Sequence, residues 1–116
     1  MAEEREIKDP QAEGLRIARN YLSRIGWTRE WKRYFTTQIS GNWSREDIEE
    51  KNLKADAMEE EAEAELSTAF EELRKRNDTD AKLTMEAILK MLGNRRDLGV
   101  IGKSIVERIR KMLMPF

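Results

Sequence analysis

Apolar residues recur at intervals of three and four along most of the chain, the spacing of one face of an α-helix. The first such stripe consists of Leu15, Ala18, Leu22 and Ile25. Gly26 follows it, and glycine is the residue most typical of a helix end. This pattern predicts a first helix that ends at Gly26.

A second helix is predicted between Thr28, a candidate N-cap, and the breaker Gly41–Asn42. Its apolar residues are Trp31, Tyr34, Phe35 and Ile39. Ser44 precedes Asp47 by three residues, which resembles a capping box and predicts a short third helix that buries Ile48. Residues 51–53 are expected to form a loop.

The longest periodic segment, roughly residues 56–76, predicts a fourth helix. Its inner stripe consists of Met58, Ala62, Leu66, Ala69, Phe70 and Leu73. The polar run 77–80 is expected to end this helix and to cap the next one. The fifth helix carries Leu83, Ala87, Ile88, Met91 and Leu92, and Gly93–Asn94 follows it.

A sixth helix is predicted before Pro115, with a stripe of Leu98, Ile101, Ile105, Ile109 and Met112. Gly99 and Gly102 weaken its start by about 1 kcal/mol each relative to alanine. Two small residues at this spacing allow close packing against a neighbour. No segment alternates apolar and polar residues as a half-buried strand does, so no sheet is expected.

Six amphipathic segments with short links predict an all-α fold, a six-helix antiparallel bundle. The bundle is expected over residues 13–114, after a flexible polar tail over residues 1–12. The chain has 116 residues, a length that suits one domain.

Cysteine and histidine are both absent from the sequence. Disulfides, zinc sites of Cys and His, and nucleophile arrangements that need His are therefore excluded. No enzyme activity, metal or cofactor is expected. No run of about 18 apolar residues exists, and the acidic N-terminus is unlike a signal peptide, so a cytoplasmic protein without membrane insertion is expected.

The near-neutral net charge of −1 hides two opposed blocks. Residues 15–45 carry a net charge of +6, and residues 46–65 carry a net charge of −8. Opposed charge of this kind steers and orients association between proteins.

Aromatic residues are interleaved with Arg and Lys between residues 21 and 43. Such a pattern occurs in grooves that bind single-stranded nucleic acid. The helical spacing of Trp31, Tyr34 and Phe35 favours core positions instead, and the acidic block would repel phosphate. Nucleic acid is therefore not the expected partner, although a helical nucleic-acid-binding domain using residues 15–45 is kept as an alternative.

Two further clusters carry charge. The carboxylates of Glu59, Glu60, Glu61, Glu63 and Glu65 are expected on a solvated helix face, because carboxylate metal sites in helical bundles usually include His.

Arg95 and Arg96 lie in the link before the sixth helix, where they are either ordinary loop residues or an anchor for a partner carboxylate. Asp97 is expected to favour the start of that helix.

The order of these segments resembles a death domain, a module of the death-fold superfamily. The segments that carry the resemblance to helices two to six are Trp31–Phe35, Ser44–Glu50, Ala62–Arg76, Thr84–Leu92, and Arg96–Leu98 with Ile101. The resemblance implies a Greek-key arrangement of the six helices and no catalytic activity.

The resemblance also implies an adaptor or receptor module that assembles with other death-fold proteins, homotypically or heterotypically, in apoptotic or innate-immune signal transduction. Combined with the charge blocks, it indicates a basic and an acidic partner-binding surface. The expected residues are Arg29, Lys32, Arg33 and Arg45 on the basic surface, Glu46, Asp47, Glu49 and Glu50 on the acidic surface, and Arg95 and Arg96 as a further contact. A dimerising helical scaffold without a signalling role is a second alternative.

Overall fold

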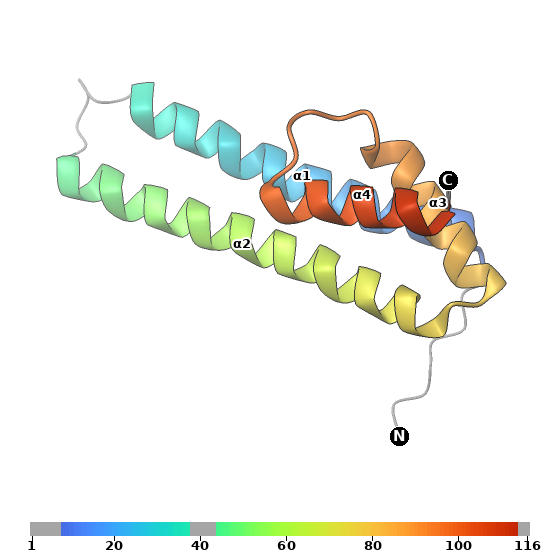
Figure 1. Ribbon diagram of the computed structural model, residues 1–116. Coiled ribbons are helices and arrows are strands. Elements are labelled where there is room, and N and C mark those ends of the chain that lie inside the picture. Colours follow the sequence, from blue (N-terminus) through green and yellow to red (C-terminus); the bar gives the residue numbers. More distant parts are fainter. Residues whose placement is uncertain (1–7, 38–43, 114–116) are drawn as a thin grey trace.

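The computed structural model describes residues 8–37 and 44–113, and within them the fold is all-α. Its four helices are α1 (Pro10–Thr37), α2 (Arg45–Arg76), α3 (Thr79–Leu92) and α4 (Val100–Leu113). Figure 1 shows α1 and α2 as a long antiparallel hairpin, with the shorter α3 and α4 packed against one part of it.

The prediction of six helices is wrong, first because the chain does not break at Gly26. α1 continues through Gly26 and Thr28 as a single helix of 28 residues. The Thr28 hydroxyl is buried and donates to the carbonyl oxygen of Ile25 at 2.9 Å, so it does not cap a new helix. Burial of Ile25 and Thr28 on either side of Gly26 outweighs the cost of about 1 kcal/mol for glycine in a helix interior.

The second reason is that the predicted third and fourth helices form one continuous helix, α2. Ser44 is the N-cap as predicted, and its hydroxyl accepts from the Asp47 N–H at 3.1 Å. Residues 51–53, expected as a loop, are helical, and Ala55 after them is buried. No glycine or proline occurs within α2, and Glu, Ala, Lys and Leu favour the helix throughout.

The predicted helix ends in the polar run 77–80 and at Gly93 are confirmed, whereas the predicted end at Pro115 lies outside the described residues. Asn77 ends α2 in the left-handed conformation, with φ of 48°, and its N–H donates to the carbonyl of Leu73. The Asp78 carboxylate then caps α3 by accepting from the Ala81 N–H at 2.8 Å. Gly93 follows the last residue of α3.

These four helices do not form the six-helix Greek-key bundle that the resemblance to a death domain implied. Residues 10–12, predicted as the end of a flexible tail, form the first turn of α1, and residues 1–7 lie outside the described part of the chain. The predicted breaker Gly41–Asn42 also lies outside the described residues.

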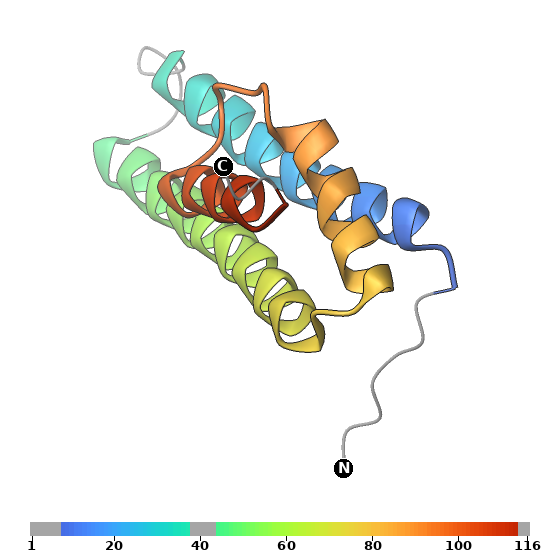
Figure 2. The same ribbon diagram turned by 45° about the vertical axis from the view of Figure 1, so that its right-hand side comes forward.

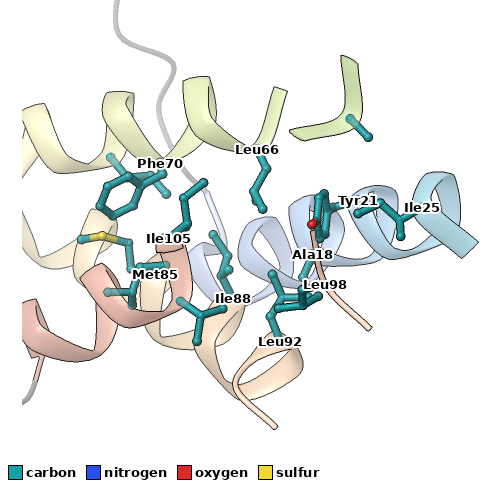
Figure 3. Close-up of a cluster of buried hydrophobic side chains, with 14 of the residues drawn as sticks. Ala18, Tyr21, Ile25, Leu66, Phe70, Met85, Ile88, Leu92, Leu98 and Ile105 are labelled. Carbon is teal, nitrogen blue, oxygen red and sulfur yellow. The ribbon is translucent and has the colours of Figure 1, made fainter. Parts of the chain in front are cut away.

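The core lies where α3 and α4 meet the hairpin. α3 packs mainly on α1, and α4 packs on both α2 and α3. Figure 3 shows side chains from all four helices meeting there, among them Tyr21, Phe70, Met85 and Ile105. Most of the predicted inner stripe of α2 is buried, namely Ala62, Leu66, Phe70 and Leu73.

The hairpin extends beyond this core. The part formed by residues 27–37 of α1 and 45–58 of α2 is called the distal hairpin below, and Figure 1 shows it reaching past the start of α4. None of the four helices is both long and apolar enough to cross a membrane.

Candidate protein-interaction surface

A buried polar cluster fixes α4 on the hairpin and so defines which side of the hairpin is covered. The Tyr21 hydroxyl of α1 donates to Glu63 Oε1 of α2 at 3.0 Å, and it accepts from the Gly99 N–H at 3.2 Å. Glu63 Oε2 accepts from the Gly102 N–H in the first turn of α4 at 2.7 Å. One carboxylate therefore joins three helices.

Glu63 was expected on a solvated face, and that expectation is wrong, because Glu63 is only 6% exposed. Its carboxylate lies at the N-terminus of α4, where free N–H groups and the helix dipole favour negative charge. Asp97, expected in this role, instead pairs with Arg95 at 3.1 Å. Burial raises the pKa of Tyr21, so its hydroxyl stays protonated and available as a donor.

The opposed charge blocks face each other across the hairpin. Arg24 of α1 pairs with Glu61 at 3.5 Å and with Glu65 of α2. Farther along, Arg29 pairs with Glu59 at 3.6 Å, and Lys32 pairs with Asp56. The Asp56 carboxylate, hydrogen-bonded to the Lys32 ammonium, raises the pKa of Lys32.

The predicted partner-binding residues are accordingly divided. Arg29 and Lys32 contact α2, whereas Arg33 and Arg96 are exposed. The other predicted residues lie on exposed surface. Along α2, Arg45 pairs with Glu49 at 3.8 Å and Glu50 pairs with Lys54 at 3.6 Å, while Glu46 and Asp47 occupy the first turn of the helix. In the link before α4, Arg95 pairs with Asp97. Their role in partner binding stays a prediction.

Three aromatic side chains form an exposed strip on the distal hairpin. Trp27, Trp31 and Tyr34 are 48%, 39% and 53% exposed. The two indole rings lie 4.6 Å apart between centroids, tilted by 49°. The expectation that Trp31 and Tyr34 belong to the core is wrong, and the Phe35 side chain lies outside what the structure describes.

The aromatic strip lies on the side of the hairpin that carries neither α3 nor α4. Arg29 contacts the backbone oxygen of Asp97, next to α4, and both Trp27 and Trp31 are two residues from it along α1. Two residues along a helix differ by about 200° in direction, so the indoles point away from α4. In Figures 1 and 2 α3 and α4 lie on one side of the hairpin.

The side that neither α3 nor α4 covers is called the open face below, and α2 contributes to it. Arg24 precedes Trp27 by three residues and Trp31 by seven, so it shares their flank of α1. Its partners Glu61 and Glu65 therefore mark the flank of α2 beside the strip. Met58 and Lys54 continue that flank at intervals of three and four from Glu61, towards the tip of the hairpin.

The spacing of the aromatic residues was visible in the sequence, but spacing alone does not distinguish an exposed strip from a stripe of core residues. Trp27, Trp31 and Tyr34 lie at i, i+4 and i+7, but so do many core residues. The discriminating fact is that α1 does not end at Gly26. A continuous helix carries the stripe of Ala18, Tyr21, Ile25 and Thr28 into the distal hairpin and leaves the aromatic residues on another flank.

No group of three or more acidic residues placed to hold a metal ion occurs in the described ranges. No protein-family model, curated protein or solved structure matches this chain. The open face, with its aromatic strip, is therefore the main candidate for function.

Proposed function

We propose that this chain is a non-enzymatic protein-binding module that contacts its partner through the aromatic strip of the open face. The observation that carries the proposal is the joint exposure of Trp27, Trp31 and Tyr34 on one flank of α1. Large apolar side chains gathered on an otherwise charged surface mark interaction sites more often than isolated ones do.

The residue types and their spacing support protein binding. Tryptophan and tyrosine are enriched among the residues that contribute most to binding energy at protein interfaces. Anchors at i, i+4 and i+7 on one helix are the arrangement by which a helix packs into an apolar groove or against another helix. The adjacent charged residues of α2 would form the polar rim of such an interface.

The strip contributes little to the core, which makes its function separable from folding. The largest buried side chains of α1 are Tyr21 and Ile25, on a different flank from the strip. Shortening Trp27 and Trp31 to alanine therefore leaves the buried side chains of α1 in place, although more than half of each indole is covered by neighbouring residues. A loss of binding in such a variant reports on the interface when circular dichroism shows that the variant is folded.

We retain protein binding as the proposed function, but we do not propose that the chain assembles as a death domain does. Assembly of that kind belongs to a six-helix module, and this chain has four helices in its described residues. Nucleic-acid binding gains no support either, because Arg24, Arg29 and Lys32 are paired with carboxylates of α2.

The test is cross-linking in cells followed by quantitative mass spectrometry. The wild-type chain is compared with a Trp27→Ala/Trp31→Ala variant and with a control, Leu83→Ala, which shortens an exposed apolar side chain of α3. The expected result is that the double variant loses a defined set of cross-linked proteins that the control retains. Circular dichroism of both variants should match that of the wild type.

Equal sets of cross-linked proteins for wild type and double variant would contradict the proposal. The alternative of nucleic-acid binding is tested by measuring the fluorescence anisotropy of a labelled oligonucleotide in the presence of the chain. Binding that weakens steeply as salt rises, and that survives loss of both indoles, would favour that alternative.

A further inference from the structure

We propose that residues 27–37 of α1, called the α1 end below, unfold locally and refold as one unit while the rest of the chain stays folded. Local unfolding of this kind occurs where few apolar side chains are buried and where the contacts that hold a segment are exposed to water. The burial, ion pairs and helix propensity of the α1 end, and the glycine that precedes it, all favour such unfolding.

Little apolar burial holds the α1 end on α2. The distal hairpin reaches past the start of α4 (Figure 1). Among its described side chains only Thr28 and Ala55 are buried, and neither is a large apolar residue. The part of α1 before Gly26, in contrast, buries Tyr21 and Ile25 in the core. Because the free energy of burial grows with the apolar area removed from water, detaching the α1 end costs less than detaching the rest of the helix.

Exposed ion pairs supply much of the contact between the α1 end and α2. Arg29 pairs with Glu59 at 3.6 Å and contacts the backbone oxygen of Asp97, and Lys32 pairs with Asp56. The side chains of Arg29 and Lys32 are 39% and 35% exposed, and that of Asp56 is 52% exposed. Ion pairs as exposed as these contribute little to stability and weaken as salt rises. The attachment of the α1 end should therefore be weak and sensitive to salt.

An unsatisfied polar atom lies on the flank of α2 that faces the α1 end. Asn52 precedes Asp56 by four residues, so the two side chains share one flank of α2. Within the described residues, the buried Oδ1 of Asn52 has no hydrogen-bond partner. A buried acceptor without a partner costs free energy, and that cost disappears when water reaches it. Departure of the α1 end would give Asn52 this contact with water.

The α1 end cannot stay helical by itself. Seven of its eleven residues are Trp, Thr, Tyr or Phe, which form helices less readily than Ala, Leu, Glu or Lys. Isolated helices shorter than about 12 residues are marginal in water even with good helix formers. The opposite segment of α2, residues 45–58, consists mainly of Glu, Lys, Ala, Leu, Met and Arg. Separation from α2 should therefore unwind the α1 end and leave α2 helical.

Gly26 marks the boundary of the unfolding segment. Nothing lies within 4 Å of a Cβ built at Gly26, so packing in the folded chain does not require glycine there. Glycine destabilises a helix interior and is the residue most favoured just after a helix end, because it readily adopts the left-handed conformation. Gly26 thus weakens the continuous helix and stabilises a helix that ends at Ile25. It sets the point at which unwinding stops.

The first experiment measures hydrogen–deuterium exchange of individual amides in the full chain by NMR. The amides of residues 29–37 should exchange at least 100-fold faster than those of residues 17–25 in the same helix, with one shared protection factor and a step next to Gly26. Protection equal to that of residues 17–25 would overturn the proposal. A gradual decline towards residue 37 would also overturn it, because that is ordinary fraying of a helix end.

Gly26→Ala tests the role of the boundary residue. Alanine favours the continuous helix and disfavours a helix end at this position, so the protection of residues 29–37 should rise about fivefold, the equivalent of about 1 kcal/mol. Ser23→Ala is the matched control, because Ser23 is exposed on the same helix but stays helical in both states. It should leave the protection of residues 29–37 unchanged. Equal effects of the two substitutions would contradict a boundary at Gly26.

Salt and charge reversal test what holds the α1 end. Raising the salt concentration should lower the protection of residues 29–37 and leave that of residues 17–25 unchanged. Lys32→Glu should lower the same protection at least tenfold, whereas Arg33→Glu, at the neighbouring exposed position, should not. Protection that responds to neither salt nor Lys32→Glu would show that the ion pairs do not control the unfolding.

Local unfolding would also disperse the aromatic strip, because Trp27, Trp31 and Tyr34 share one flank only while the α1 end is helical. This consequence for binding rests on the proposed function, but the exchange measurements do not. If residues 29–37 exchange as slowly as residues 17–25, local unfolding is overturned and the proposed function stands. If the α1 end unfolds as expected but Trp27→Ala/Trp31→Ala keeps every cross-linked protein in cells, the local unfolding stands and the proposed function fails.

Discussion

The hydroxyl of Tyr21 donates a hydrogen bond to the carboxylate of Glu63 at 3.0 Å, joining residues 42 positions apart in the chain. The other oxygen of Glu63 accepts from the Gly102 N–H at 2.7 Å. α4 follows a link without regular structure, so this contact is what sets where its first turn rests on the hairpin. The position of α4 in turn determines which face of the hairpin stays open.

Tyr21→Phe and Glu63→Gln should each lower the free energy of unfolding by about 1–3 kcal/mol. Each variant leaves a buried donor or acceptor without a partner of the right kind. The two changes act on one hydrogen bond, so the double variant should lose less than the sum of the single losses. Urea denaturation of the wild type, both single variants and the double variant measures this difference, and strictly additive losses would show that the two groups do not act together.

Gly102→Ala should destabilise the chain, whereas Gly26→Ala should stabilise it. A Cβ at Gly102 would lie 2.2 Å from the Tyr21 hydroxyl oxygen, while nothing lies within 4 Å of a Cβ at Gly26. Forcing an extra methyl into a packed contact costs about 1–3 kcal/mol. Alanine at an exposed interior position of a helix gains about 1 kcal/mol over glycine. Thermal melting of the two variants should therefore shift in opposite directions, and a shared direction would contradict this account of α1 and α4.

The sequence predicted those features that depend on local chemistry. Helix ends at Ser44, Asn77–Asp78 and Gly93 were correct, because caps are built from side chains that bond to their own neighbouring backbone. The value of Gly99 and Gly102 for close packing was also predicted, and both lie against the Tyr21–Glu63 contact. The all-helical class followed from periodicity alone.

The features that depend on distant partners could not be predicted in the same way. Gly26 is a plausible helix end by itself, and only burial of Ile25 and Thr28 against other helices keeps α1 continuous through it. Glu63 stands in a run of glutamates, and its burial depends on where α4 begins. The two charge blocks were recognised, but which acid meets which base depends on the hairpin that brings Lys32 to Asp56.

Asp78 should make the stability of the chain depend on pH in the acid range. The Ala81 N–H and the Arg76 guanidinium lower the pKa of Asp78 from its ordinary value of 3.8. Because this pKa is lower in the folded chain than in the unfolded chain, its contribution is present above about pH 4 and is lost as pH falls through the lowered value. Acid titration of the melting temperature in wild type shows the combined effect of this and similar carboxylates.

Asp78→Asn isolates the contribution of Asp78. Asparagine is as good an N-cap as aspartate but carries no titrating group, so the cap remains while its pH dependence disappears. The melting temperature of the variant should therefore fall less steeply than that of the wild type below pH 4. Parallel curves would mean that the Asp78 carboxylate has the same pKa in both states.

Lys32→Glu should destabilise the distal hairpin, and Arg33→Glu should not. Lys32 lies beside Asp56 and, at 3.7 Å, Glu59, so a carboxylate at this position faces two like charges. Arg33 is the neighbouring residue and is exposed, which makes it a matched control for charge reversal on α1. Exposed ion pairs contribute about 0–1 kcal/mol each, and repulsion of similar size is expected.

The compensating variant Lys32→Glu/Asp56→Lys should recover part of the lost stability, because it restores an opposite pair across the hairpin. Raising the salt concentration should narrow the gap between Lys32→Glu and wild type, since added ions screen exposed charges. Urea denaturation at low and high salt measures both effects. If Arg33→Glu proves as destabilising as Lys32→Glu, the loss comes from the overall charge of α1 rather than from the pairing of Lys32 with α2.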